Sequence, residues 1–391
     1  MCKEYFSPCE FQGSDTERIQ QAVNAGAAGN GIVKIFPKED RTPYMLESAI
    51  LLPSHVTVYL ENCHIKLADS CRDNIFRTAN CGVDCGTVDE VEDIHLIGIG
   101  KAVLEGADHP RSTGDSGKIL GERTYGTDAG KEGVSQKGGW QNIGVLFVKL
   151  KNFTLENFTV KDPHCWGISL EYCSCGKVKD IVFDAEENRV IDGVPWKVLN
   201  QDGLDLRRGC RNIIIDTISG RSGDDLVALT ALLTKERPAG NVESTEMCGS
   251  TGDLEKEHVC NIVIRNVHGY STGGHQIVRF LNARGVKMHH ITLDGVMDTS
   301  APDGKRAFAC VRVGDTNPVY GIPPVGDTAG FLISNIQTNT RRGVIISGTL
   351  ADSIISRVIN YNPESRGVTF VAPREEATRN VVVESVIDCF S

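Results

Sequence analysis

From about residue 32 onward, hydrophobic and polar residues alternate in a succession of short stretches. Six stretches align as an imperfect repeat: "LKNFTLENFTV", "VKDIVFDA", "CRNIIIDTISG", "VCNIVIRNVHG", "VKMHHITLDG" and "TRNVVVESVID". Each begins with a polar residue, often Asn, continues with apolar or β-branched residues at alternate positions, and ends in a turn. Alternation with a period of two predicts strands that bury one face.

The stretches recur at a spacing of roughly two to three dozen residues, without helices between them. This spacing predicts a right-handed parallel β-helix, in which every coil buries its inner face against the next coil. A β-sandwich would also fit the alternation, but Asn-Gly and Asp-Gly hairpins between consecutive strands are nearly absent. We therefore expect an all-β protein with one β-helix domain over residues 1–391.

A short helix is predicted near the start of the chain, within residues 12–30. Ser14 and Glu17 form an S-x-x-E capping box, and the following "RIQQAV" places Ile19 and Val23 on one helical face. We expect this helix to cap the N-terminal end of the solenoid.

Two segments do not fit the repeat. Residues 106–140 are rich in Gly and charged side chains, and residues 231–258 are polar and broken by Pro and Gly. Loops of this length are usually functional or disordered. We expect both to be excursions that wall a cleft, the alternative being surface loops without a role.

The amino-acid composition narrows the classes of molecule that this protein could bind. The 51 acidic and 41 basic residues give a formal charge of −10, which disfavours nucleic acids and anionic membranes. The 14 cysteines lie largely in apolar runs such as "AFACVRV", so we expect most to be reduced and buried, without metal-site spacing. We find neither a signal peptide nor an apolar run long enough to span a membrane, and expect a cytoplasmic protein.

Two carboxylate-bearing motifs are the strongest chemical signal. "NQDG" contains Asp202 and "SGDD" contains Asp224 and Asp225, about one coil further on. Equivalent positions on adjacent coils lie about 4.8 Å apart, so the three carboxylates would meet on one solvent-facing surface. Like charges at this range raise at least one pKa, which supplies an acid beside a base. The alternative is that these are ordinary turn residues at strand ends.

Two later residues extend the candidate site. His275 follows a Gly-Gly pair in "STGGHQIVRF", where the backbone can approach another group closely and a histidine can move protons. Arg312 in "AFACVRVGD" offers a guanidinium for a carboxylate or a sugar diol. Each could instead be an ordinary structural or surface residue.

With "NQDG", "SGDD", "GGH" and a later Arg in this order, the chain resembles the polygalacturonase-type glycoside hydrolases of family 28. "GSDTERIQQAVNAGAAGNG" and "DPHCWGISLEYC" extend this resemblance over most of the chain. It implies that Asp224 is the general acid and that Asp202 and Asp225 activate water. It also implies that His275 assists the acid, that Arg312 holds substrate, and that the anomeric centre is inverted.

Three departures from the family pattern concern substrate binding. The Asn-Thr-Asp motif reads "NQD" with Asn200, and the Gly-His-Gly motif ends in Gln276. The Arg-x-Lys motif ends in Gly314, so the family lysine that neutralises a galacturonate carboxylate is missing. Arg279 could substitute for it; otherwise the pocket would prefer a neutral or differently linked sugar. We expect Asn200, Gln276, Arg279 and Arg312 to contact substrate.

We therefore expect an inverting glycoside hydrolase that acts on a pectic or related plant-type glycan, with exo-action suggested by the long insertions. No cofactor or metal ion is expected. One alternative is a β-helix lyase or fructotransferase, in which the aspartates could bind calcium. Another is a glycan-binding solenoid without catalytic activity.

Overall fold

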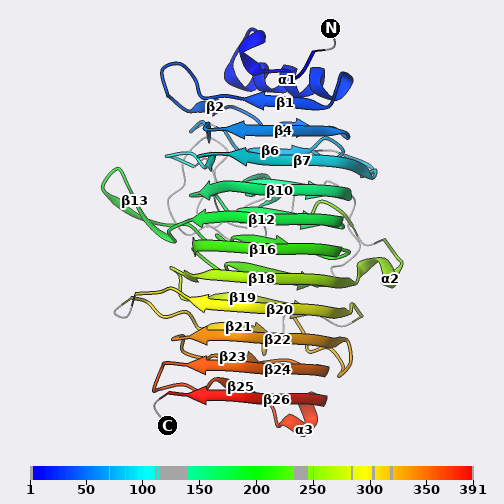
Figure 1. Cartoon of the computed structure of the whole chain (residues 1–391), viewed down its shortest axis with the longest axis vertical. Helices are drawn as coiled ribbons and strands as arrows, with labels where there is room; N and C mark the ends of the chain where they lie inside the picture. Colours follow the sequence, from blue (N-terminus) through cyan, green and yellow to red (C-terminus); the bar gives the residue numbers. More distant parts are fainter. Residues whose placement is uncertain are drawn as a thin grey trace, which may run out of the picture.

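The computed structural model describes residues 3–69, 71–83, 85–110, 113, 139–232, 245–249, 251–282, 285–301, 304–317 and 320–389. Over these residues the chain forms a right-handed parallel β-helix, which confirms the predicted fold (Figure 1). The N-terminus and the C-terminus lie at opposite ends of the stack of coils. Most of 106–140, and residues 233–244 of the second predicted excursion, lie outside the described residues.

Two long parallel sheets make up the described coils. The first sheet contains β1 (Ile32–Ile35), β4 (Val56–Glu61), β7 (Val91–Ile99), β10 (Leu150–Lys161), β12 (Ser174–Asp184), β16 (Arg211–Ser222), β18 (Val259–Ser271), β20 (Met288–Asp298), β22 (Thr328–Thr338), β24 (Leu350–Asn360) and β26 (Thr378–Asp388), joined by β2 (Tyr44–Leu46), β5 (His64–Leu67) and β8 (Val103–Glu105). The second sheet contains β3 (Ile50–Leu52), β6 (Phe76–Thr78), β9 (Val145–Val148), β11 (Ile168–Glu171), β15 (Leu204–Leu206), β17 (Val227–Ala231), β19 (Gln276–Asn282), β21 (Ala309–Val313), β23 (Val344–Ile346) and β25 (Val368–Phe370).

The remaining described elements are short. They are the helices α1 (Asp15–Ala28), α2 (Leu254–Glu257) and α3 (Arg374–Ala377), the 3-10 turns η1 (Pro8–Glu10) and η2 (Gly139–Asn142), and the antiparallel strands β13 (Asn188–Ile191) and β14 (Val194–Lys197). The hairpin of β13 and β14 projects sideways from the stack (Figure 1).

Helix α1 closes the N-terminal end of the core, as predicted. The Ser14 side chain accepts a hydrogen bond from the Glu17 backbone, and the Glu17 side chain accepts one from the Ser14 backbone. Ile19, Ala22 and Val23 are fully buried in the main core. The capping box therefore fixes the first turn, and burial of the apolar face holds the helix over the first coils.

The Asn that begins several of the sequence repeats has a conformational explanation. At one register position, successive coils place a residue in the left-handed region, with φ values between 49° and 68°. This left-handed ladder consists of His55, Asp93, Asn152, Cys175, Asn212, Asn261, His290, Gly330, Asp352 and Asn380. Asn, Asp and Gly tolerate this backbone better than other residues, so each long strand bends at the same place.

The interior of the second sheet consists of apolar side chains in register. Leu204 pairs with Val227, which pairs with Val278, and Leu206 and Leu229 continue the core two positions later. All are fully buried. The residues between them, Asp205, Ala228 and Arg279, form a second column that points away from this core.

Most of the described cysteines are buried, in agreement with the prediction. None of the helices in the described part of the chain is both long and apolar enough to cross a membrane.

Candidate active site

Consecutive coils of the second sheet place Asp202 and Asp225 at equivalent positions. Each lies two residues before a member of the paired column Leu204, Val227 and Val278. The Gly203 N–H donates to the Asp225 carbonyl at 2.9 Å, which ties the two coils together directly. By the same register, Trp166 precedes Asp202 and Gln276 follows Asp225. We call Trp166, Asp202, Asp225 and Gln276 the aspartate stack.

Glycines allow the two aspartate motifs to approach each other. A Cβ atom on Gly203 would lie 2.4 Å from the Leu226 carbonyl oxygen, and one on Gly223 would lie 2.7 Å from Oε1 of Gln201. The Gln201 carbonyl accepts hydrogen bonds from the backbone of Gly223 and Asp224. The turns formed by "NQDG" and "SGDD" are therefore hydrogen-bonded to each other.

The carboxyl group of Asp202 lies below the surface, which corrects the expectation that all three aspartates face solvent. Asp202 is 9% exposed, and Asp225 is 2% exposed. Burial raises the pKa of Asp202 well above its usual value; the charges of Asp205, Asp224 and Asp225 raise it further, and Arg279 opposes them. The coils stack so tightly that these short side chains are covered.

Asp205, on β15, is a second buried acid beside Asp202. Burial raises its pKa well above 3.8, while the nearby charge of Arg207 and a hydrogen bond from Asp202 act in the opposite direction. Burial and the charges of Asp224 and Asp225 therefore disfavour ionisation of both Asp202 and Asp205.

Asp225 is held in place by a backbone hydrogen bond and a cation. Its Oδ1 accepts from the backbone N–H of Gln276 at 2.8 Å, and its Oδ2 lies 3.5 Å from a guanidinium nitrogen of Arg279. Arg279 also pairs with Asp315, which lies 3.0 Å from Arg312. Both arginines predicted to bind substrate are thus engaged by Asp315.

Asp224 differs from its neighbours because it is partly exposed and adjoins a histidine. Its Oδ1 lies 3.3 Å from Nδ1 of His275, whose side chain is 43% exposed. The other ring nitrogen of His275 lies 3.9 Å from Oε1 of Glu187. Burial lowers the pKa of His275 below 6.5; the charges of Asp225 and Glu187 oppose this effect, and Lys305 and Lys197 reinforce it.

Of the two remaining predicted substrate contacts, one lies beside the stack and the other is part of it. Asn200 has a left-handed backbone, with φ of 54°, and is half-buried. Gln276 is buried, and its Oε1 has no hydrogen-bond partner. Gln276 thus belongs to the stack, whereas Asn200 lies at its margin.

A concentration of unsatisfied polar atoms distinguishes this region. Among the described residues, buried side-chain atoms without a hydrogen-bond partner gather on and beside the stack: Nε1 of Trp166, Oε1 of Gln201, Oδ1 of Asp202, Oδ2 of Asp205, Nε of Arg207, Oε1 of Gln276 and Nε of Arg279. Leaving one such atom unpaired costs about 1–3 kcal/mol, so native proteins keep few of them.

Three site residues were missing from the sequence prediction. Asp205 could have been found, because a charged residue in "LDL" must point away from the core of an alternating strand. Glu187 precedes the β13–β14 hairpin and Asp315 follows β21, outside any recognised motif. Their approach to His275 and to the arginines depends on turns whose geometry the motif pattern does not encode.

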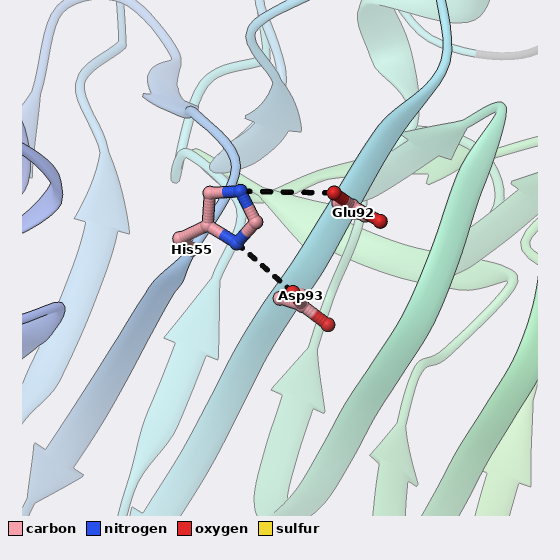
Figure 2. Close-up of side chains that lie close together, drawn as sticks. All are labelled: His55, Glu92 and Asp93. Carbon is pink, nitrogen blue, oxygen red and sulfur yellow. Dashed lines mark hydrogen bonds and ion pairs between the residues drawn. The ribbon is translucent and has the colours of Figure 1, made fainter.

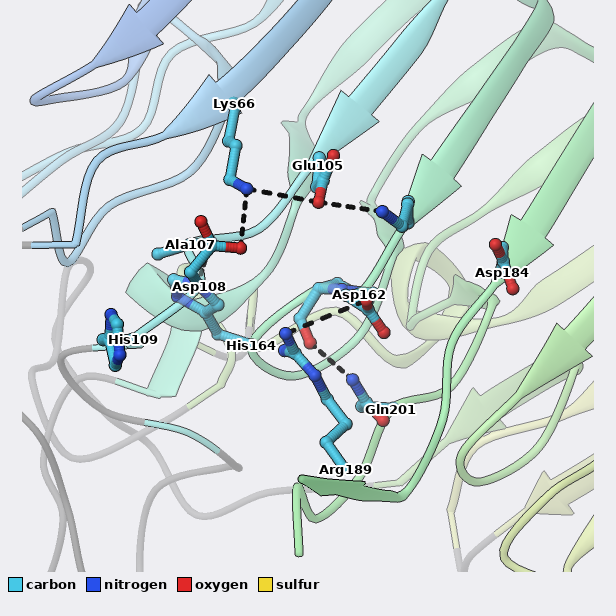
Figure 3. A network of polar contacts seen from close by, with 12 residues as sticks. Lys66, Glu105, Ala107, Asp108, His109, Asp162, His164, Asp184, Arg189 and Gln201 are labelled. Atoms are coloured by element: carbon cyan, nitrogen blue, oxygen red, sulfur yellow. Dashed lines mark hydrogen bonds and ion pairs between the residues drawn. The ribbon is translucent and has the colours of Figure 1, made fainter. Parts of the chain in front are cut away.

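The turn that leads into the aspartate stack is anchored by a neighbouring polar network (Figure 3). Gln201 donates to the Pro163 carbonyl at 2.7 Å, and Nε2 of His164 accepts from the backbone of Ala107 at 2.8 Å. Burial lowers the pKa of His164 to about 3, so its imidazole is neutral and remains an acceptor. These contacts hold the backbone on which Trp166 and Asp202 stand.

Part of the 231–258 segment packs on the second sheet beside the site. Glu246 pairs with Arg207 at 2.8 Å, and the backbones of Met247 and Cys248 donate to Glu171. Burial and the charge of Glu246 raise the pKa of Glu171 to about 7. These contacts fix residues 245–249 next to Arg207, two positions beyond Asp205.

A different cluster, on the first sheet, could coordinate a cation by distance alone. Within the described residues, His55, Glu92 and Asp93 bring potential ligand atoms within 4.8 Å of one another (Figure 2). Nδ1 of His55 lies 2.9 Å from Asp93, and Asn152 donates to the same carboxylate. His55, Asp93 and Asn152 are members of the left-handed ladder, whose repeated backbone conformation accounts for this grouping.

Comparison with known proteins shows that this chain is similar in fold to several solved structures. No protein-family model matches the sequence, and no curated protein matches it. A polygalacturonase from Erwinia carotovora shares 16% identity over 100% of this chain and 98% of that chain, with a TM-score of 0.52.

An exopolygalacturonase from Thermotoga maritima shares 13% identity over 98% of this chain and 93% of that one, with a TM-score of 0.54. The tailspike protein of Escherichia coli bacteriophage HK620, solved with a pentasaccharide, shares 13% identity over 94% and 60% of the two chains, with a TM-score of 0.56. At these identities the likeness shows one thing: this chain has the β-helix fold of those proteins.

Proposed function

We propose that this protein is a glycoside hydrolase whose active site is the aspartate stack with Asp205, Asp224 and His275. One observation carries the proposal: seven of the fourteen described side-chain atoms that are buried without partners lie on or beside the stack, around carboxyl groups of raised pKa. The resemblance to family 28 enzymes supports it, because the same motifs supply these residues.

The chemistry of the unsatisfied atoms favours a sugar. The group contains acceptors, on Asp202 and Gln276, and donors, on Trp166 and Arg279. A sugar hydroxyl both donates and accepts, so a glycan can satisfy both kinds of atom. The Trp166 ring adds an apolar surface to this polar set.

The arrangement can supply both an acid and a base for hydrolysis with inversion. Asp224, beside His275, would protonate the leaving oxygen as the glycosidic C–O bond breaks. Asp202 and Asp225 would accept a proton from the water whose oxygen bonds to the anomeric carbon on the opposite face. A base with a raised pKa removes that proton more effectively than an ordinary carboxylate once it is ionised.

The directions of the pKa shifts define the expected pH dependence. Activity should rise as pH passes the raised pKa of the Asp202–Asp205 pair, because the base must lose its proton. It should fall as pH passes the lowered pKa of His275, because the proton beside Asp224 is then lost. The two pKa values shift toward each other, so we expect a bell-shaped profile of kcat/KM that is narrower than ordinary Asp and His pKa values would give.

Solved structures support a glycan ligand without fixing the reaction. The neighbours with TM-scores above 0.5 include two polygalacturonases and a tailspike bound to a pentasaccharide. The tailspike complex is the observation that favours a second candidate, a glycan-binding protein. That candidate requires affinity without turnover.

A proton NMR time course with pectic and neutral plant oligosaccharides separates these functions. Hydrolysis by inversion predicts that the product appears first as the inverted anomer and that Asp224→Asn removes the signal. An alkene resonance would instead identify a lyase. Binding without any product, unchanged by Asp224→Asn, would identify a glycan-binding protein and refute hydrolysis.

A further inference from the structure

We propose that Asp315 is a specificity-determining residue, which makes the site beside Asp225 select an uncharged sugar over an anionic one. The inference rests on the proposed function and specifies the substrate class of that same site. It follows from the way in which Asp315 compensates two arginines that would otherwise be free to bind an anion.

Arg279 and Arg312 are neighbours on the outer face of the second sheet. They are register partners on β19 and β21, so their side chains leave adjacent coils about 4.8 Å apart. A guanidinium nitrogen of Arg279 lies 3.5 Å from Oδ2 of Asp225, which places the pair next to the aspartate stack. Two adjacent guanidinium groups offer the donors that a carboxylate or a sulfate accepts.

The carboxylate of Asp315 already occupies these donors. Its Oδ2 accepts a hydrogen bond from Arg279, and its Oδ1 accepts one from Arg312 at 3.0 Å. The backbone N–H of Asn317 also donates to Oδ1, at 2.9 Å. Asp315 is 7% exposed, and the side chains of Arg279 and Arg312 are 16% and 14% exposed. One protein carboxylate therefore bridges both arginines, with one oxygen for each, as a bound anion would.

A turn at Gly314 brings Asp315 to the arginines. The Gly314 N–H donates to the Phe280 carbonyl on the preceding coil at 2.7 Å, and Gly314 has φ of 75°. A Cβ atom on Gly314 would lie 2.5 Å from the Cα of Gly348 on the following coil. Only glycine fits this close approach, so the chain can turn directly after β21 and place the next side chain against Arg279.

We call Asp225, Arg279, Asp315 and Arg312 the charge row. When all four side chains are ionised, its two positive and two negative charges balance. An anionic sugar beside this row would meet two protein carboxylates and no uncompensated cation, and like charges in close contact weaken binding. A neutral sugar meets no such repulsion.

Aromatic rings beside the charge row offer contacts that do not depend on substrate charge. The guanidinium of Arg279 lies 5.7 Å from the centre of the Tyr320 ring, and that of Arg312 lies 5.2 Å from the centre of the Phe308 ring. Both rings are half-buried. Their exposed parts present apolar surface that suits the C–H faces of an uncharged sugar.

Binding of a matched charged and uncharged pair tests the proposal. We would titrate the full-length Asp224→Asn protein with trigalacturonate and with its methyl ester, using isothermal titration calorimetry. The neutral ester should bind about tenfold or more tightly than the anionic form. This comparison leaves Asp315 in place, so it remains informative even if substitution of Asp315 prevents folding.

Asp315→Asn, added to the same protein, keeps the size of the side chain but removes its charge. Two arginines then face one carboxylate, so the affinity for trigalacturonate should rise about tenfold while that for the ester changes little. Asp352→Asn makes the same change on the first sheet and should alter neither affinity. The double variant Arg312→Gln/Asp315→Asn restores the charge balance and should lose the gain. Thermal denaturation verifies that each variant is folded.

Three results would overturn the proposal: tighter binding of trigalacturonate than of its ester while Asp315 is intact, an effect of Asp315→Asn no larger than that of Asp352→Asn, or binding of neither probe. Turnover of an acidic glycan that Asp224→Asn removes would retain the hydrolase and reject the neutral preference. Selective binding of the neutral ester, without turnover of any glycan by the wild type, would do the reverse.

Discussion

The left-handed ladder of the first sheet and the aspartate stack of the second both repeat polar residues at one position of successive coils, but they differ in how those residues are satisfied. In the ladder, Asn261 donates to Asn212, and Asn380 donates to Asp352, on the exposed surface. In the stack, buried oxygens of Asp202 and Gln276 have no partner. One repetition stabilises the solenoid, and the other leaves buried polar atoms unsatisfied.

The pKa values show the same contrast. Hydrogen bonds from Arg379 and Asn380 lower the pKa of Asp352, so the folded state favours its charge. Burial and neighbouring carboxylates raise the pKa of Asp202, so the folded state disfavours its charge. A repeat architecture can therefore turn one residue type into a structural anchor or a reactive acid, according to burial and partners.

The largest difference should come from making one substitution in both regions. Asp202→Asn should reduce kcat about a thousandfold, because a general base is lost. It should also raise the Tm at pH 7: the folded pKa lies above the unfolded value, so any stability this group contributes exists at low pH and is lost as pH rises. Activity assays and thermal denaturation measure the two effects.

Asp352→Asn is the matched control for that experiment. It retains a residue suited to the left-handed backbone but loses the ion pair with Arg379, so activity should persist while the Tm falls slightly at pH 7. A fall in Tm for Asp202→Asn that parallels its loss of rate would make Asp202 a structural residue.

Removing a cation should destabilise the two regions unequally. Arg279→Gln leaves Asp225 and Asp315 without their shared cation, and we expect a loss of about 3 kcal/mol in the free energy of unfolding. Arg379→Gln, at an exposed pair of the ladder, should cost much less, because solvent screens that pair. Urea denaturation of both variants tests the contrast, and equal costs would contradict it.

A backbone substitution should affect the ladder alone. Asn212 has φ of 57°, so Asn212→Ala should reduce stability by about 1 kcal/mol, whereas Asn212→Gly should be tolerated better. Both variants should retain wild-type turnover, because the ladder lies on the first sheet whereas the stack precedes strands of the second. A catalytic defect in the well-folded Asn212→Gly protein would show that the two regions are not independent.

The smallest expected effect is electrostatic. The charged groups that face His275 are Asp224, Asp225, Glu187, Lys197 and Lys305. Glu187→Gln removes a charge that raises the pKa of His275, so the imidazole should titrate at lower pH and the basic limb of the rate profile should follow.

Nitrogen NMR of labelled histidine measures this directly, without substrate. Glu186→Gln is the matched control, because the adjacent Glu186 pairs with Arg221 instead. An unchanged His275 titration in Glu187→Gln would show that the carboxylate at 3.9 Å has no electrostatic influence on the histidine.

Sequence patterns predicted the fold and part of the candidate site, for identifiable reasons. Period-two alternation and the Ser14 capping box depend on local chemistry, which the sequence displays directly. The spacing of Asp202 and Asp225 predicted that they lie close together, because one coil of a solenoid brings equivalent positions together. Burial of these aspartates was not foreseen, since coverage by neighbouring coils depends on the packed tertiary structure.

The sequence patterns also did not predict the carboxylates that turns bring to His275 and the arginines. Glu187 reaches His275, and Asp315 joins Arg279 to Arg312, through segments without a repeat or a motif. Arg279 was recognised as a possible replacement for the missing lysine, but its pairing with Asp225 and Asp315 depends on three different coils. Such contacts are determined by loop geometry and not by the spacing of residue types.

The central claim is that the aspartate stack holds a buried acid whose charge the fold disfavours, and a carbon-13 NMR titration of the Asp202 carboxyl tests it most directly. The resonance can be assigned by its absence from the spectrum of Asp202→Asn. The account predicts a pKa well above 3.8 in the folded protein. Titration at or below 3.8 would mean that the stack is a second structural ladder and would contradict the account.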